Sequence, residues 1–348
     1  MTFPFKCELS YFSSPHLSQL YDGFQRLADA GIVSISYASS TGDPEKPLLA
    51  VTVNDSYRII YDTLDGLNWI DGTIEDNLQY FQHHIQADFY FKRSFNKQVA
   101  QHAPPDCKVY PLGLNYAFSP TDGVAKPIAD KAKDLAKLLL SAYYGKLLFS
   151  ASDFEHYPVP TGNDRILFLA RLWNPADVAL PHLKAEREAI NQNRINCIRA
   201  CRAEFGDQFV GGLQDEAYSR SQAPDLILPS SLTRREPFLR AVKQSDICIA
   251  TAGLHDSIGW KFGEYVAAAR AMVAEPLAYM LPGDFTEGTN YLPFTSESEL
   301  IANVRHLLNN PQDRLAMMRR NFDYYQNHVR SDILVLNTLL KISETREG

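Results

Sequence analysis

Short apolar runs alternate with helix-patterned stretches along the chain, and this alternation constrains the fold more than any other feature. In the first half, runs rich in β-branched and aromatic residues stand at 32–37, 48–53, 57–61, 88–91 and 108–112. Apolar residues recur at helical spacing within 17–30 and 128–144. Strands separated by helices predict an α/β layer, with an antiparallel hairpin over 34–53 as the alternative.

A segment rich in turn-forming residues divides the chain in two. It covers 153–164 and contains Pro158, Pro160 and Gly162, which is typical of a hinge. A second α/β pattern follows, with apolar runs at 165–170, 209–212, 246–250 and 272–274. Because 348 residues exceed the usual size of one core, we predict two domains, 1–155 and 156–325, and a helical tail at 326–348.

Composition and charge exclude several classes of protein. The chain has 34 basic and 41 acidic residues, and this net negative charge argues against a general nucleic-acid binder. The first residues do not resemble a secretory signal, and no apolar run approaches the roughly 20 residues that span a bilayer. We therefore expect a cytoplasmic protein with at most peripheral contact to the inner face of a membrane. The 5 scattered cysteines predict reduced thiols, and their spacing indicates no zinc site.

The stretch 245–292 carries the clearest chemical signal. An apolar strand ends in Thr251, Ala252 and Gly253, and ligands of open α/β sheets bind beyond the carboxyl ends of such strands. Asp256 and Glu264 flank seven residues, and Glu264 precedes a small-residue run that is compatible with a helix. Carboxylates accept hydrogen bonds from sugar hydroxyls, while loop N–H groups bind phosphates. The alternatives are a first-turn helix acid for Glu264 and a turn or cap residue for Asp256.

This order of elements resembles the nucleotide-sugar domain of GT-B glycosyltransferases. In that family Glu, seven residues and Glu precede a small-residue helix, a short apolar strand and a Gly-containing loop. Glu264 matches the second acid, whereas Asp256 stands at the first and is one methylene shorter. The similarity covers about 164–325 and includes Gly-Thr-Asn-Tyr-Leu at 288–292. The resemblance implies an α/β protein of two Rossmann-like domains that face each other across a cleft.

The resemblance also implies roles for individual residues. In the family the second acid holds the ribose hydroxyls and the first holds the hexose. An Arg after the first strand of the domain clamps the diphosphate, and the run Ala170-Arg171-Leu172 matches its position. The family's lysine is not present at 173–176, which leaves the second cation unassigned, and the solvated alternative for Lys261 stays open. The implied catalytic residues are Asp256, Arg171 and Lys261, and the implied donor-binding residues are Glu264, Gly253, His255, Ser257 and Arg171.

The first half would hold the acceptor, and its chemistry is less specific. A carboxylate or histidine there would act as general base in an inverting reaction. The candidates are Asp62, Asp65, His16, His83 and His84, each with a turn, cap or surface role as the alternative. Lys92 and Arg93 follow the strand at 88–91 and would meet an anionic acceptor or the donor phosphates, unless they are a solvated pair.

The function that the resemblance implies is sugar transfer. We expect a metal-independent, hexosyltransferase-like enzyme that moves a sugar from a nucleotide-diphosphate sugar to a glycan, lipid-linked or other hydroxyl acceptor. The implied setting is bacterial surface polysaccharide or glycoconjugate synthesis, with no cofactor, no metal and no nucleic-acid partner. A retaining outcome is weakly preferred. The alternatives are a nucleotide-sugar 2-epimerase of the same fold and a non-catalytic subunit that binds a sugar nucleotide.

Overall fold

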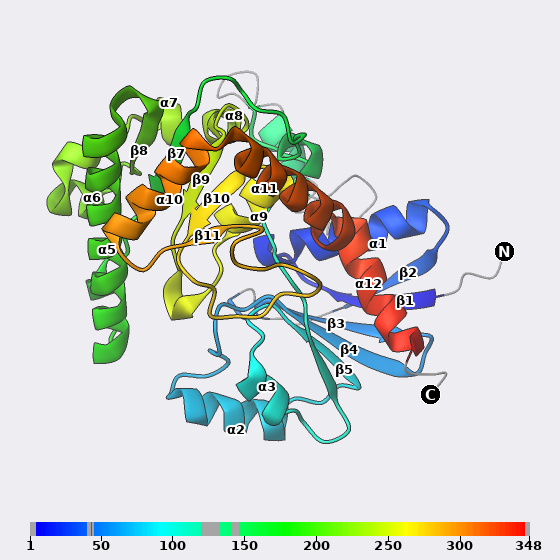
Figure 1. The fold of residues 1–348 in the computed structure, drawn as a ribbon. Coiled ribbons are helices and arrows are strands. Elements are labelled where there is room, and N and C mark those ends of the chain that lie inside the picture. Colours follow the sequence, from blue (N-terminus) through cyan, green and yellow to red (C-terminus); the bar gives the residue numbers. More distant parts are fainter. Residues whose placement is uncertain are drawn as a thin grey trace. The chain divides into compact units, whose positions relative to one another are not determined.

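The computed structural model describes residues 5–39, 43, 45–119, 132–138, 140 and 146–344. The chain divides into two compact units, each with one sheet and its own helices (Figure 1). Unit 1 comprises Met1–Asp153, Ala278–Asp284 and Gln326–Gly348, and unit 2 comprises Phe154–Leu277 and Phe285–Tyr325. The predicted α/β class is confirmed in both units. The stretch 326–348, expected as a separate tail, is part of unit 1, and the cleft between two domains stays a prediction.

Unit 1 contains a mixed sheet, with 6 strands among the described residues in the order β2-β1-β3-β4-β5-β6. The strands are β1 Phe5–Tyr11, β2 Val33–Ser39, β3 Leu48–Val53, β4 Tyr57–Asp62, β5 Phe89–Lys92 and β6 Lys108–Pro111. β3 runs antiparallel to β1 and β4, and the other neighbours are parallel. The hairpin therefore joins β3 to β4 through Asn54 and Asp55, both at positive φ, and the alternative hairpin over 34–53 is wrong.

The helices of unit 1 include the last helix of the chain. They are η1 Pro15–Leu17, α1 Ser18–Asp29, α2 Ile74–His84, α3 Lys97–Gln101, η2 Ala151–Asp153 and α12 Ser331–Glu344, with a π-helical turn at Tyr325–Val329 before α12. The predicted helix 128–144 lies partly outside the described residues. α1 and α12, blue and red in Figure 1, lie side by side, and a Cβ on Gly23 would overlap the carbonyl oxygen of Ser331. Glycine permits this close approach.

Unit 2 contains a parallel sheet, with 5 strands among the described residues in the order β11-β10-β9-β7-β8. The strands are β7 Ile166–Ala170, β8 Phe209–Leu213, β9 Ile247–Ala250, β10 Ala271–Ala274 and β11 Leu292–Pro293. Every residue of β7, β9 and β10 is buried, as expected for parallel strands covered on both faces. The strand order reverses between β7 and β9, so their carboxyl ends border the crevice where doubly wound sheets bind ligands.

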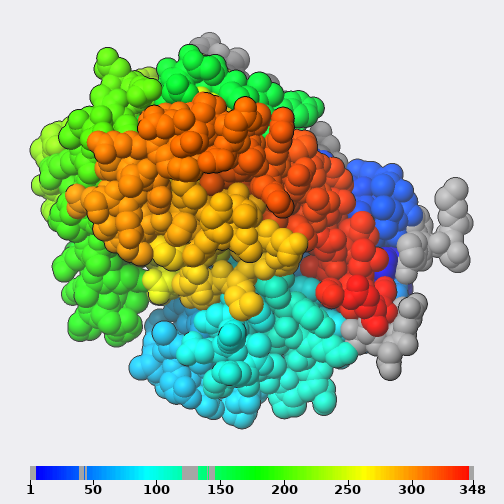
Figure 2. All heavy atoms as spheres, in the orientation of Figure 1, coloured from blue at the N-terminus to red at the C-terminus, as the bar shows by residue number. Residues whose placement is uncertain are grey.

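Helices cover this sheet, and the longest is α5. In chain order they are η3 Pro175–Asp177, α5 Pro181–Phe205, η4 Gly206–Gln208, α6 Ala217–Gln222, η5 Pro224–Leu226, α7 Ser230–Thr233, α8 Arg235–Lys243, η6 Leu254–Asp256, α9 Trp260–Ala267, α10 Glu297–Asn309 and α11 Pro311–Tyr324. Figure 2 shows α10 and α11 together on the surface of unit 2, and both contact β10. Within the described part of the chain, no helix has the length and apolar character to cross a membrane.

Candidate functional site

Arg194 of α5 joins the two loops at the switch point of unit 2. Its Nε donates to Thr251 Oγ1 at 3.0 Å, its Nη1 to the Arg171 carbonyl at 2.7 Å and its Nη2 to the Ala252 carbonyl at 2.9 Å. The residue is only 8% exposed. These bonds satisfy carbonyl groups that the short loops leave unpaired, and they hold the ends of β7 and β9 in one arrangement.

Glu275 supports the same loop from the end of β10. Its Oε2 accepts the Ala252 N–H at 2.7 Å, and its Oε1 accepts Asn193 Nδ2 at 2.8 Å. A small pocket opens beside this loop, and residues from 250–252, 256–259, 262 and 274–277 line it. The carboxyl ends of β9 and β10 thus border this pocket.

The loop from Gly253 to Gly259 has a tight backbone. The Gly253 N–H donates to the Ser257 carbonyl at 2.8 Å, and a Cβ on Gly253 would lie 2.6 Å from Ser257 Oγ. His255 and Asp256 both adopt positive φ, which is uncommon for residues other than glycine. The His255 N–H donates to Glu186 Oε1 at 2.5 Å. The surroundings therefore hold this strained loop, and Asp256 lies exposed at the pocket.

Glu264 lies inside α9 rather than at its start. The helix begins at Trp260 after the N-cap Gly259, so Glu264 is its fifth residue, and the first-turn interpretation is wrong. Its residue exposure is 2%. Oε1 pairs with Arg235 at 2.8 Å, while Oε2 is buried with no hydrogen-bond partner among the described residues. A buried acceptor without a donor is costly, so a ligand hydroxyl here would be favourable.

Lys261 points from the first turn of α9 to the end of β7, where its Nζ donates to the Leu169 carbonyl. The solvated alternative is therefore wrong. Burial lowers the pKa of Lys261 to about 8. Three arginines lower this pKa further and one carboxylate raises it, and the four groups are Arg194, Glu264, Arg171 and Arg235. Four cations thus gather near two carboxylates, Glu264 and Glu275, and this excess of positive charge attracts an anion.

Arg171 is exposed at the end of β7, and an aromatic ring orients it. Its guanidinium carbon lies 3.8 Å from the ring centroid of Trp173. The backbone N–H of Trp173 donates to Asn191 Oδ1 at 2.8 Å, and the backbone carbonyl of Trp173 accepts from Asn191 Nδ2 at 2.7 Å. The buried Asn191 therefore fixes the tryptophan, and cation–π stacking fixes the arginine.

Sequence reasoning missed several of these supporting residues, namely Trp173, Asn191, Arg194, Arg235 and Glu275. The available signal was in the long helix α5. Asn191 and Arg194 lie beside Ile195 and Ile198 on its buried face, and polar residues at core positions indicate partners that must be found elsewhere in the chain.

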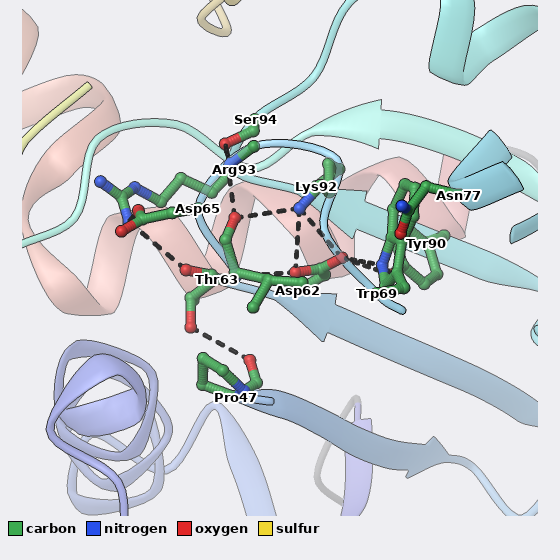
Figure 3. A network of polar contacts seen from close by, with 12 residues as sticks. Pro47, Asp62, Thr63, Asp65, Trp69, Asn77, Tyr90, Lys92, Arg93 and Ser94 are labelled. Carbon is green, nitrogen blue, oxygen red and sulfur yellow. Dashed lines mark hydrogen bonds and ion pairs between the residues drawn. The ribbon is translucent and has the colours of Figure 1, made fainter. Parts of the chain in front are cut away.

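In unit 1, Asp62 is the centre of a buried network (Figure 3). Its carboxylate accepts hydrogen bonds from four donors, which are Trp69 Nε1 at 2.8 Å, Tyr90 Oη at 2.5 Å, the Leu64 N–H at 2.8 Å and Lys92 Nζ at 3.2 Å. Asp62 and Lys92 are each 0% exposed. A general base must reach a substrate proton, so the geometry does not support Asp62 as the base. Because Lys92 is fully buried, it is neither solvated nor facing a ligand, and both predicted interpretations are wrong. Burial lowers the pKa of its ammonium group.

Asp65 lies at the edge of this network and has more exposure. Its side chain is 39% exposed and accepts from Arg93 Nη1 at 2.5 Å. The pKa of His16 is lowered, mainly by burial. The charge of Asp65 opposes this shift and the charge of Arg93 adds to it, so the three groups share one electrostatic environment. His83 and His84 are exposed in the last turn of α2. Among the predicted general bases, the fold places His16 and Asp65 close enough to interact electrostatically.

No protein-family model and no curated protein matches the chain. Similar solved structures include HepE (Alr3699) of Anabaena in complex with UDP-glucose, with 11% identity, 94% of each chain covered and a TM-score of 0.45. Sucrose-phosphate synthase from Thermosynechococcus elongatus has 12% identity over 78% of this chain and 62% of its own, with a TM-score of 0.41. The C-terminal domain of LpcC, a group 1 glycosyl transferase family protein of Francisella tularensis, has 9% identity over 52% of this chain and 98% of its own, with a TM-score of 0.37. The predicted resemblance to glycosyltransferases is confirmed as a likeness of structures.

Proposed function

We propose that unit 2 binds a nucleotide-diphosphate sugar and that the protein transfers this sugar to a hydroxyl acceptor. The supporting observation is the group of cations at the switch point between β7 and β9. A half-buried lysine and three arginines lie in one electrostatic environment there, together with the carboxylates of Glu264 and Glu275. Such an excess of positive charge at the carboxyl edge of a parallel sheet is suited to a diphosphate.

Arg171 and Lys261 contact the diphosphate in this proposal, and Arg194 holds the loops that carry it. Transfer breaks the bond between the sugar carbon and the diphosphate oxygen, which keeps the electron pair. Cations beside that oxygen stabilise the developing negative charge. These side chains offset the negative charge that a divalent metal would otherwise offset. We therefore propose a metal-independent reaction.

Glu264 and Asp256 divide the rest of the donor between them. Glu264 Oε2 is buried without a partner among the described residues, and a ribose hydroxyl is the donor it needs. Asp256 lies in the exposed strained loop and lines the pocket, where its carboxylate accepts from sugar hydroxyls. Gly253, His255 and Ser257 keep the loop backbone in the shape that this pocket requires.

We propose that unit 1 activates the acceptor, which is a glycan or lipid-linked hydroxyl of the kind used in bacterial surface polysaccharide synthesis. Burial keeps His16 neutral and therefore able to accept a proton, while Asp65 stabilises the cation that forms. This assignment predicts an inverting reaction, in contrast to the retaining outcome that the sequence weakly favoured.

Thermal shift and isothermal titration calorimetry with UDP, GDP, ADP and their sugar conjugates test the proposal. A ligand that binds only the native state raises the melting temperature. We expect at least one diphosphate to bind wild type, to bind Glu264→Gln weakly, and to bind the exposed control Glu236→Gln normally. Absence of binding by wild type would refute the donor site. Binding without turnover of any sugar conjugate would instead favour the non-catalytic subunit, and acceptor-independent conversion of the sugar would favour the epimerase.

A further inference from the structure

Arg235, the first residue of α8, contacts Glu264 although no motif in the sequence includes it. Its guanidinium lies 2.8 Å from Glu264 Oε1. Its guanidinium carbon lies 4.7 Å from the ring centroid of Phe154 and 5.9 Å from that of Phe238. Two aromatic faces and one carboxylate therefore restrict this arginine to one position, although a third of its side chain is exposed.

The ion pair determines what Glu264 can offer a ligand. Arg235 is a cation beside a carboxylate with 2% exposure, and its guanidinium occupies Oε1. The oxygen left without a partner among the described residues is Oε2, and a carboxylate oxygen accepts hydrogen bonds.

We infer that Arg235 is the residue that makes this site specific for a ribonucleotide, by holding the Glu264 carboxylate oriented with Oε2 as the acceptor for a ribose hydroxyl. The inference rests on the proposed donor site in unit 2. A site built to bond a hydroxyl discriminates against an analogue that lacks it, because the buried acceptor then stays unpaired. Arg235 therefore acts through Glu264 as a positioning residue.

The opposite role gives the opposite result. An arginine that blocked Glu264 until the ligand displaced it would weaken binding, and its removal would strengthen the binding of every nucleotide. A positioning arginine strengthens binding, and its removal weakens ribonucleotide binding more than deoxyribonucleotide binding. The ratio of the two affinities separates this role from a general loss of positive charge, which weakens both ligands alike.

The test is calorimetric titration of UDP, GDP and ADP, each beside its 2′-deoxy form, into wild type, Arg235→Met and Arg235→Lys. Arg240→Met is the matched control, because Arg240 lies on the same helix with a side chain that is 62% exposed. For the diphosphate that binds best, we expect wild type to prefer the ribo form by about tenfold, the ratio for one good hydrogen bond. Arg235→Met should bring this ratio to about one, Arg235→Lys should keep part of it, and Arg240→Met should keep all of it.

An unchanged ratio in Arg235→Met, or tighter binding of both forms, overturns the inference. If Arg235→Met does not fold, as judged by circular dichroism, Arg235→Lys decides the question, and a wild-type ratio there overturns the inference too. Wild type that binds the ribo and deoxy forms equally also overturns it, although the donor site would stand. Wild type that binds none of the three diphosphates refutes the proposed function itself.

Discussion

Raising the pH should weaken diphosphate binding through Lys261. Burial holds the pKa of this lysine at about 8, far below its ordinary value of 10.5. Only the protonated ammonium attracts a phosphate, so binding is favoured below pH 8 and is lost as the pH rises through that value. A bound anion raises this pKa in turn, because ligand and proton favour each other.

The size of the effect follows from the fraction of protonated lysine. When only the protonated form binds, the apparent Kd increases by the factor 1 + 10^(pH − pKa), which with the pKa at about 8 gives a rise of about tenfold between about pH 7 and about pH 9. Residual binding to the neutral form reduces this rise. The terminal phosphate, with a pKa of about 6, is ionised over the whole range and adds little.

Isothermal titration calorimetry of the tightest-binding diphosphate, from pH 7 to pH 9 in buffers of equal ionic strength, measures this rise. Lys261→Met should bind more weakly at pH 7 and show a nearly flat profile. Lys184→Met is the matched control, because Lys184 is exposed on α5 and should leave the wild-type slope unchanged. A flat wild-type profile, or the same slope in Lys261→Met, would refute the assignment of Lys261 to the phosphate.

Three further substitutions test the supporting structure. Trp173→Leu removes the stacking partner of Arg171 and should weaken diphosphate binding by about 3-fold to 30-fold in calorimetry, while equal affinity would show that the ring does not orient the cation. Gly253→Ala places a Cβ 2.6 Å from Ser257 Oγ and should weaken binding, with partial recovery in the Gly253→Ala/Ser257→Ala double variant. Asp62→Asn leaves a buried ammonium without its counter-ion and should lower the free energy of unfolding in urea by about 3 kcal/mol, whereas an unchanged midpoint would contradict a structural role.

The order of strands and helices could be predicted well from local patterns. The predicted strand at 48–53 coincides with β3, and the predictions for β7, β9 and β10 differ by a residue or less at each end. Buried parallel strands are continuous apolar runs, and a local window contains that signal. β1 was missed although its buried residues alternate, because its place beside β2 and β3 depends on partners far along the chain.

For the candidate site, too, local patterns predicted some features and missed others. Glu264 and Arg171 were predicted from family motifs and Lys261 from its place in the same loop, and the ligand roles of all three stay predictions. The start of α9 was misplaced by four residues, since Gly259 rather than an acidic residue is its N-cap. The error matters chemically, because it moves Glu264 from an exposed helix start into a buried interior.

What the sequence determined by itself is therefore the α/β class, the two repeats of the pattern and the loop that carries the acidic residues. Only the tertiary structure decided that Asp62 and Lys92 neutralise each other in a core, that Arg194 and Glu275 hold the loops at the switch point of unit 2, and that Arg235 pairs with Glu264. The physical reason is distance along the chain. Hydrophobic periodicity is set by neighbouring residues, whereas the partner of a buried charge is set by which distant segments the folded sheet brings within hydrogen-bond reach.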